Sequence, residues 1–454
     1  MGGNKVIRDP VHGYISVRAE DLPLLDHPLM QRLRRIGQTG AGVVYPGATH
    51  TRFEHSLGVM HLSQRIFDGL VQRESFGRAT KELGNTIRYA ALLHDIGHPP
   101  LSHVGERLMK RADLVTELAA ATKEAGLSFT PPSEAPKHEL ASCIIALRHL
   151  RRELDKLDVD LDLFCRAIVG QTDGCPADKA CAVEILNSSI DSDKLDYVLR
   201  DAFATGADLV SLDAERMLAA YCAQDGRLAV DSRALSAIVG LVRGRSNLYT
   251  WVYNHHAVVF RDAALERYLN YLGVDTPEVH DLFSTDGLAN RLCDDGDVWH
   301  LLRSSASRDG ICSDFFGQLS SRRYLKAVWK TPLEFVKVFE DTPVLMDKFI
   351  MRVKESQTKE RLESWISAIA SSVELQPTDI CIANAKVTPN WQEAYIRTRH
   401  PATDQATLKR FTELFPMPSF LRPYQFDQLP FLYTNPDYRD RVLTSLKESL
   451  GGRR

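Results

Sequence analysis

A histidine followed directly by an aspartate, His94-Asp95, ends a strongly apolar stretch of the chain. An ionised carboxylate beside an imidazole in apolar surroundings is costly unless it is paired or bound to a metal ion. A hydrogen-bonded pair in the core meets the same need, so the dipeptide alone leaves both interpretations open. His55 lies on the apolar face of its own predicted helix, where a structural histidine is the alternative to a metal ligand.

A second group of polar residues lies in the segment 191–201. Asp193, Tyr197 and Asp201 follow one another at intervals of four residues, so they share one face of a predicted helix. Arg200 lies beside that face. The apolar residues of the segment take the opposite side and are expected to pack on the core: Leu195, Val198, Leu199 and Ala202. A solvated surface would show the same pattern, but the neighbouring motifs favour a functional face.

These segments offer two imidazoles and two carboxylates: His55, His94, Asp95 and Asp193. Such a set suits a divalent transition metal such as Fe, Mn, Co or Zn. A bound metal ion polarises a phosphoryl oxygen, lowers the pKa of a bound water molecule, or does both. The pattern therefore predicts a metal centre that could serve the hydrolysis of a phosphate ester.

Hydrolysis of a phosphate ester also needs an acid for the leaving oxygen, a base or orienting group for water, and positive charge for the phosphates. A histidine held by a carboxylate can serve as acid or base, and the chain offers His98, His103 and His138 near Glu106 and Glu139. A structural role in a proline-rich turn is the alternative for each histidine. Positive charge is available from Arg52 and Lys194, which stand beside predicted ligands.

Helices are the elements that must position these residues. Apolar residues recur at helical spacing over residues 53–72, and a second apolar helix over 85–96 is stopped by Gly97 and Pro99-Pro100. Residues 125–137 form a predicted proline-rich loop. Further helices are predicted over residues 28–37, 138–150, 191–204, 212–222, 231–270 and 277–294.

The pattern changes after about residue 330. Helices are predicted around 333–354 and 357–371, a strand within 375–387, and a final helix near 436–450, after a proline-rich stretch at 415–426. We therefore expect a mainly α protein, with a helical core over residues 1–330 and a smaller mixed α/β lobe over residues 331–454.

Composition restricts the function further. The net charge of −3 over 454 residues argues against a protein whose main task is to coat nucleic acid, because such binding needs clustered Lys and Arg. The eight cysteines contain no C-x-x-C pair, which is typical of reduced thiols in a cytoplasmic protein. We expect no signal peptide and no membrane span, because the sequence contains no suitable apolar run.

Four motifs resemble those of the deoxynucleoside triphosphate triphosphohydrolases of the HD superfamily. They are HTRFEHSLG (50–58), LLHDIGHPPLSH (92–103), HE (138–139) and IDSDKLDYVLRD (190–201). The chain is most similar to the group of sterile-alpha-motif and HD-domain enzymes, also at IRDPVHGYI (7–15), HPLMQRLRRIGQTG (27–40), YPGATHTRFEHS (45–56) and NLYTWVYNHHAVVFRD (247–262). The resemblance covers about residues 5–265 and fades in 330–454. We expect no separate sterile-alpha-motif domain.

The resemblance implies a helical HD-domain core and assigns its catalytic residues. The implied metal ligands are His55, His94, Asp95 and Asp193. His103 resembles the general acid for the leaving 5′ oxygen. The supporting relay is implied to be His98, Glu106 and His138.

The resemblance also implies a substrate site for a nucleotide. Phosphate contacts are implied for Arg52, Lys194 and Tyr197, and contacts to the sugar 3′-hydroxyl for Gln38 and Asp201. Tyr253 matches a residue that packs against the sugar, where a 2′-hydroxyl would clash. Thr39 stands where the similar group has a larger apolar residue, so its hydroxyl could tolerate ribose.

In this family the reaction expels intact triphosphate from the nucleoside, often with a second ion, commonly Mg, on the phosphates. Regulated members bind an activating guanine nucleotide at positions that match Asp26, Gln31 and Arg34, for which a helix cap and salt bridge is the alternative. The resemblance implies a homo-oligomer, either a dimer or a tetramer, that limits nucleotide pools in defence against phage.

Two other functions fit the same ligand motifs. The first is an HD-type nuclease or phosphodiesterase that acts on nucleic-acid ends or cyclic nucleotides, which the near-neutral charge disfavours for a long nucleic acid. The second is a non-catalytic nucleotide sensor, which the complete set of predicted ligands and His103 disfavours.

Overall fold

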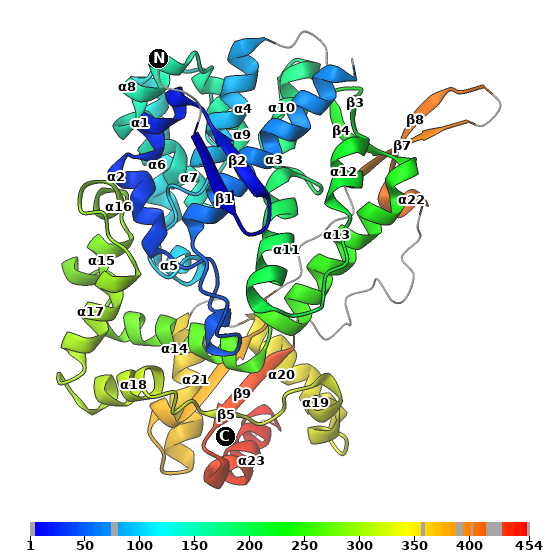
Figure 1. Ribbon diagram of the computed structural model, residues 1–454. Helices are drawn as coiled ribbons and strands as arrows, with labels where there is room; N and C mark the ends of the chain where they lie inside the picture. Colours follow the sequence, from blue (N-terminus) through cyan, green and yellow to red (C-terminus); the bar gives the residue numbers. More distant parts are fainter. Residues whose placement is uncertain are drawn as a thin grey trace. The chain divides into compact units, whose positions relative to one another are not determined.

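The computed structural model describes residues 5–73, 80–355, 359–386, 394–400, 403–414 and 429–451. Helices dominate these residues, and the strands form small sheets (Figure 1), so the prediction of a mainly α fold is confirmed. None of the described helices combines the length and the apolar character that crossing a membrane requires.

The chain forms two compact units. The first comprises Met1–Leu248, Pro277–Val298 and Pro389–Leu421, and the second comprises Tyr249–Thr276, Trp299–Thr388 and Arg422–Arg454. This division differs from the boundary at residue 330 that we predict from sequence, because the chain passes between the units several times. A change of local sequence pattern cannot report such returns.

The core of the first unit is built on two long helices, α3 (Arg52–Gln72) and α4 (Lys81–Leu93), which pack against each other. Around them lie α7 (Lys137–His149), α9 (Leu161–Val169), α10 (Ala177–Leu186) and α11 (Ser192–Thr205). Apolar residues at helical spacing fill the space between these helices and are fully buried, among them Met60, Ile66, Leu92, Ile144 and Val198.

Shorter elements complete the helical part of this unit. The helices are α1 (Leu22–Leu25), α2 (Pro28–Arg32), α5 (His103–Leu108), α6 (Arg111–Glu124), α8 (Arg151–Leu154), α12 (Ala214–Ala220), α13 (Leu235–Asn247), α15 (Pro277–Phe283), α16 (Thr285–Asn290) and α22 (Phe411–Leu414). The 3-10 turns are η1 (Ala19–Asp21), η2 (Leu33–Arg35), η3 (Ala41–Val43), η4 (Asp155–Leu157) and η5 (Ser232–Ala234). Residues 125–136 contain no helix or strand, which agrees with the predicted proline-rich loop.

The start of α3 is fixed by a capping box. The backbone N–H of Thr51 donates to the Glu54 carboxylate over 2.7 Å, and the Thr51 side chain accepts from the backbone N–H of Glu54. This arrangement satisfies N–H groups that have no partner inside the helix. It also sets where Arg52 and His55 begin the helical register.

The helix α4 ends earlier than its sequence predicts. We predict a helix to residue 96, but the last helical residue is Leu93, so His94 and Asp95 lie in the turn that follows. The turn is pressed against α7: a Cβ atom on Gly97 would lie 2.3 Å from the backbone nitrogen of Ser142. Only a glycine allows this approach, and Ser142 Oγ donates to the carbonyl of His94 over 2.6 Å.

Two small sheets belong to the first unit. The strands β1 (Lys5–Asp9) and β2 (Gly13–Val17) form an antiparallel hairpin. The second sheet has the order β3-β4-β7-β8, from β3 (Tyr221–Gln224), β4 (Arg227–Asp231), β7 (Tyr395–Arg399) and β8 (Ala406–Arg410). Its β4 and β7 strands run parallel, so a late segment of the chain completes a sheet begun near residue 221.

The second unit mixes helices with the three-stranded sheet β5-β9-β6. Its strands are β5 (Lys326–Ala327), β6 (Ile380–Asn384) and β9 (Pro430–Thr434), and its helices include α14 (His256–Leu272), α18 (Gly310–Ser320), α19 (Pro332–Val338), α20 (Pro343–Glu355), α21 (Lys359–Ser372) and α23 (Arg439–Gly451). The chain enters this unit through the π-helical turn η6 (Leu248–Tyr253), and α17 (Asp295–Ser305) spans the later crossing.

An aromatic cluster forms the core of the second unit. Trp329, Phe335, Phe339 and Phe349 are all buried, with ring centroids 5.0 to 6.1 Å apart. The predicted strand within 375–387 and the predicted final helix are both present, as β6 and α23. The proline-rich stretch 415–426 lies outside the described residues.

Candidate metal centre

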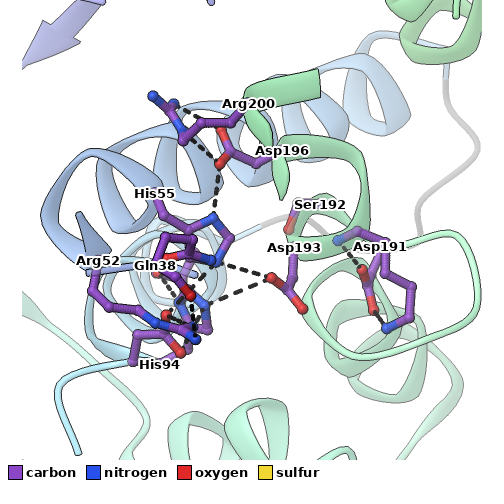
Figure 2. A network of polar contacts seen from close by, with 12 residues as sticks. Gln38, Arg52, His55, His94, Asp191, Ser192, Asp193, Asp196 and Arg200 are labelled. Atoms are coloured by element: carbon purple, nitrogen blue, oxygen red, sulfur yellow. Dashed lines mark hydrogen bonds and ion pairs between the residues drawn. The ribbon is translucent and has the colours of Figure 1, made fainter. Parts of the chain in front are cut away.

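The four side chains that we predict as metal ligands converge in the first unit. The Nε2 atom of His55 lies 3.0 Å from Asp193 Oδ1 and 3.7 Å from Asp95 Oδ2. The Nε2 atom of His94 lies 3.5 Å from Asp95 Oδ1 and 3.9 Å from Asp193 Oδ1. Figure 2 shows His55 and His94 turned toward Asp193, with their helix and turn on one side and α11 on the other.

The donor atoms of this group are suited to a cation. The ligand atoms of His55, His94 and Asp95 all lie within 4.8 Å of one another, and all three residues are buried. The Nε2 atom of His94 is buried and has no hydrogen-bond partner among the described residues, whereas its Nδ1 atom bonds to the carbonyl of Ala91 over 2.8 Å. An unpaired buried nitrogen is costly, and two imidazoles with carboxylates form a ligand set for a divalent transition metal.

Three separate elements bring these ligands together. His55 lies in the first turn of α3, His94 and Asp95 lie in the turn after α4, and Asp193 lies in the first turn of α11. Asp191 caps α11 and accepts from the backbone of Lys194 over 2.7 Å, which fixes the direction in which Asp193 projects.

The electrostatics of the site favour positive charge. Burial disfavours the charged form of His55, but hydrogen bonds to Asp193 and Asp196 outweigh it and raise the pKa of His55 to about 10. Burial likewise disfavours the charged carboxylate of Asp95, and the nearby Arg52 guanidinium and histidines hold the pKa of Asp95 well below its usual range. A field that attracts a proton this strongly also stabilises a metal cation.

A second group of histidines lies beside the metal ligands. Glu106 bridges two of them: its Oε2 atom lies 3.1 Å from His103 Nδ1, and its Oε1 atom lies 3.0 Å from His138 Nδ1. The ring of His98 stacks on His138 with 4.1 Å between centroids. The Nε2 atom of His98 lies 3.5 Å from Asp95 Oδ1, so this group adjoins the predicted ligands.

The charges of this group are set by Glu106. Burial works against its ionised form, but His138 and His103 outweigh burial and lower the pKa of Glu106. Burial alone would lower the pKa of His138, whereas Glu106 raises it to about 9. Burial and the neighbouring Arg52 and His138 lower the pKa of His98. His138 and His98 therefore differ in protonation near neutral pH although their rings are stacked.

Arg52 is tied to both groups. Its Nη1 atom donates to Asp95 Oδ2 over 2.7 Å, and its Nε atom donates to Ser102 Oγ over 3.1 Å.

Ser102 has a φ of 55° and Leu101 a φ of 62°, which is unusual for residues with a side chain. The turn is held because Asp295 accepts from the backbone of Leu101 over 2.7 Å and from Gly37 over 3.0 Å. Strained backbone of this kind is frequent at functional sites.

The structure places the residues that we predict for the sugar and phosphates on the same unit. Gln38 is buried, and its Oε1 atom has no hydrogen-bond partner among the described residues. Asp201 is buried and pairs with His50 Nε2 over 2.7 Å. Lys194 pairs with Asp191 over 2.7 Å. Thr39 and Tyr197 are half-buried.

The remaining predicted residues are Tyr253 and the three residues of the predicted activator site. Tyr253 is buried in the second unit, where its ring packs edge-on against Tyr249 with 5.0 Å between centroids. Asp26 is exposed at the end of α1. Gln31 and Arg34 bond to each other over 2.9 Å, and the Arg34 guanidinium lies 3.6 Å from the ring centroid of Phe53.

Sequence reasoning missed one carboxylate beside the metal centre. Asp196 is fully buried, and its Oδ2 atom lies 2.7 Å from His55 Nδ1. Arg200, which we predict beside the polar face of its helix, instead points inward and binds Asp196 (Figure 2). The signal was available, because a carboxylate among apolar positions, followed by an arginine four residues later, indicates a buried pair.

Two protein families match the chain. Residues 52–178 match the HD domain, and residues 212–453, more than half of the chain, match the HD associated region. The chain belongs to the HD-domain family. The first match contains His55, His94 and Asp95, so three of the four candidate ligands of this HD-domain protein lie within the matched domain.

Relatives of this HD-domain protein are found in all domains of life. The uncharacterized protein MJ1154 of Methanocaldococcus jannaschii is 30% identical over 63% of this chain and 54% of its own length. The deoxynucleoside triphosphate triphosphohydrolase SAMHD1 of Danio rerio is 29% identical over 55% of this chain and 42% of its own length. The human SAMHD1 is 28% identical over 55% of this chain and 42% of its own length. The chain thus spans about half the length of these relatives.

Two solved structures share the fold of this HD-domain protein along nearly its full length. A phosphohydrolase from Bacteroides thetaiotaomicron superimposes with a TM-score of 0.67, at 23% identity over 95% of this chain and 99% of its own. A hypothetical protein from Aquifex aeolicus superimposes with a TM-score of 0.66, at 22% identity over 98% of this chain and 100% of its own. The fold of this chain is therefore also found in solved structures.

Proposed function

We propose that this protein is a metal-dependent phosphohydrolase that converts deoxynucleoside triphosphates to deoxynucleoside and triphosphate. The observation that carries the proposal is the approach of His55 and His94 to the carboxylate of Asp193, at 3.0 and 3.9 Å. The acid–base group of His103, Glu106 and His138 lies next to it. The SAMHD1 relatives, whose name states this activity, support the choice of substrate.

In this proposal His55, His94, Asp95 and Asp193 hold a divalent metal ion of the Fe, Mn, Co or Zn class, and a Mg ion accompanies the phosphates. A metal ion in such a site supplies Lewis-acid polarisation of a phosphoryl oxygen and an acidified water molecule. Arg52 is fixed by Asp95 and Ser102 at the edge of the site, where it contacts phosphate oxygens.

The group around Glu106 moves the proton that the leaving oxygen needs. His103 is more than half exposed, so it can reach a bound substrate, while Glu106 holds its Nδ1 atom over 3.1 Å. The Nε2 atom of His103 lies 3.4 Å from Nη2 of Arg52, which we assign to the phosphates, so a proton on Nε2 can pass to the 5′ oxygen as it departs. His138 keeps Glu106 ionised and oriented, and the ring of His98 stacks on His138.

The sugar side is formed by Gln38 and Asp201. The sugar 3′-hydroxyl donates its hydrogen bond either to the buried Oε1 atom of Gln38 or to the carboxylate of Asp201 beside His50. These contacts select a nucleoside with a free 3′-hydroxyl. Thr39 bears on the choice between deoxyribose and ribose, because its small side chain leaves room for a 2′-hydroxyl.

A product analysis tests the proposal. The protein is loaded with Fe, Mn, Co or Zn in turn, with and without Mg, and incubated with single dNTPs, dNTP mixtures, mixtures with GTP, NTPs and short DNA. We expect triphosphate and deoxynucleoside in equal amounts. If every nucleotide survives, the proposal fails; if nucleoside monophosphate is the product, the protein is a nuclease or phosphodiesterase. Asp193→Asn is the inactive control.

Regulation is a secondary part of the proposal. Asp26, Gln31 and Arg34, of which Asp26 and Arg34 are exposed, bind an activating nucleotide, and the protein acts as a cytoplasmic homo-oligomer that lowers nucleotide pools in phage defence. Gln31 already bonds to Arg34 and to the carbonyl of Leu25, so an activator would replace internal bonds. Dependence of the rate on added GTP tests this part separately.

A further inference from the structure

His55 makes polar contacts through both of its ring nitrogens. Its Nε2 atom faces Asp193 and Asp95, whereas its Nδ1 atom lies 2.7 Å from Asp196 Oδ2. A histidine can bind a metal ion through Nε2 only if the proton sits on Nδ1 and the ring keeps its orientation. Asp196 therefore controls both properties of this predicted ligand.

Asp196 is itself held by an unusually complete set of donors. Its Oδ1 atom accepts from His12 Nε2 over 2.5 Å and from Arg200 Nη2 over 2.9 Å. Its Oδ2 atom accepts from Arg200 Nε over 2.9 Å and from His55 Nδ1 over 2.7 Å. A carboxylate has about four acceptor positions, so all of them are used and Asp196 can act toward His55 only as an acceptor.

The N-terminal hairpin supplies one of these donors. His12 lies in the turn between β1 and β2, and Asp9 at the end of β1 accepts from the backbone N–H groups of Val11 and His12 over 2.9 and 2.8 Å. The second oxygen of Asp9 accepts from Arg200 Nη1 over 2.9 Å. Asp9 thus fixes the turn that carries His12 to the same arginine that holds Asp196.

The helix α3 leaves space for this arrangement. A Cβ atom on Gly58, one turn after His55, would lie 1.8 Å from Asp196 Oδ1 and 2.5 Å from Arg200 Nη2. No side chain fits there while Asp196 keeps its position. The polar group therefore lies directly against the helix that carries His55.

We propose that His12 is a positioning residue of the metal centre, which acts through Asp196 on His55. The inference gives a role to the IRDPVHG motif, and it rests on the proposed function only in that His55 is a metal ligand. His12 touches neither substrate nor metal. Without its donor, one position on Asp196 Oδ1 is empty and the carboxylate can turn away from His55.

Metal affinity is the direct readout of this role. Loss of an outer contact to a metal-binding histidine weakens metal binding by about 10- to 100-fold in other proteins. We expect a weakening in this range for Co(II) and Mn(II) in His12→Phe, measured by competition with a chelator on the full chain. His12→Gln retains an N–H donor and should recover a substantial part of the affinity.

The control is His61→Phe. The ring of His61 lies 5.7 Å from that of His12, so this variant makes a similar change in the same packing environment without removing a donor to Asp196. We expect its metal affinity to stay within about twofold of the wild type, since it leaves the outer contacts of His55 in place. Denaturant unfolding of the metal-free proteins shows whether any variant has merely lost its fold.

The outcomes separate this inference from the proposed function. If folded His12→Phe binds Co(II) and Mn(II) as tightly as the wild type, or if the wild type binds neither, the inference is overturned. If the wild type binds metal and His12→Phe does not, the inference stands even when no dNTP is hydrolysed. A comparable loss in His61→Phe would show that general packing, rather than the bond to Asp196, matters.

Discussion

The carboxylate of Glu106 and the imidazole of His138 form a hydrogen-bonded ion pair, with 3.0 Å between Oε1 and Nδ1. The pair raises the pKa of His138 to about 9 against the effect of burial. Because the other oxygen of Glu106 binds His103, the charge of one carboxylate acts on the protonation and orientation of two histidines.

Glu106→Gln should therefore disable catalysis without removing the metal. The amide keeps the size of the side chain but not its charge, so neither histidine is held as before. We expect kcat to fall by about 100-fold or more, the range for loss of acid–base catalysis, with unchanged metal content by elemental analysis. Glu134→Gln, at an exposed position in the neighbouring loop, is the control. Equal rates in the two variants would contradict the relay.

Asp193→Asn should lose the metal itself. The substitution removes the charge that faces both His55 and His94, so the bound transition metal should drop well below one per chain. The measurement is elemental analysis together with the rise in melting temperature on adding Mn(II). Asp208→Asn, at an exposed position beyond the same helix, should bind like the wild type. Full metal occupancy in Asp193→Asn would remove Asp193 from the ligand set.

Gly97→Ala should destabilise the first unit. The added methyl group would lie 2.3 Å from the nitrogen of Ser142 and 2.6 Å from the carbonyl oxygen of His138, and backbone atoms cannot yield as a side chain can. We expect the free energy of unfolding to fall by about 3 kcal/mol. Gly310→Ala meets nothing within 4 Å and should change it by less than about 1 kcal/mol. A stable Gly97→Ala protein would show that the turn can move away from α7.

His256 should make the protein sensitive to acid. Burial, together with the adjacent His255 and two lysines, lowers the pKa of His256 to about 4. In the unfolded chain this histidine has its ordinary pKa of about 6.5. Its contribution to the stability of the fold is therefore fully present above that pH and is lost as the pH falls toward 4. Between pH 7.5 and pH 5.0, the free energy of unfolding should fall by about 1 kcal/mol less in His256→Gln than in the wild type. Parallel pH profiles would contradict this.

The convergence of the candidate metal ligands could be predicted from sequence because their motifs are local. Each predicted ligand lies in a helix, or in the turn that follows one, that the sequence pattern predicts. Packing of α11 against α3 then brings the ligands together. Asp196 was missed because His12, which binds it, and Asp9, which shares Arg200 with it, come from a hairpin far away in the chain. Only the i to i+4 spacing to Arg200 indicated that it would be buried.

The strands show the same limit. The hairpin of β3 and β4 turns at Asp225-Gly226, where φ is 53° and 75°, and an Asp-Gly pair between apolar runs is a recognised signal for such a turn. We instead predict a helix as far as residue 222. The parallel pairing of β4 with β7 has no local signal, because it joins segments separated by much of the chain.

That parallel pairing has a consequence for biosynthesis. The sheet β3-β4-β7-β8 needs residues up to Arg410, so the first unit is incomplete while the ribosome is still translating the second. A chain cut after residue 330 would expose β4 as a bare edge open to association with other chains. Nearly the whole chain must therefore be synthesised before the sheet of the unit that contains the candidate metal ligands can be completed.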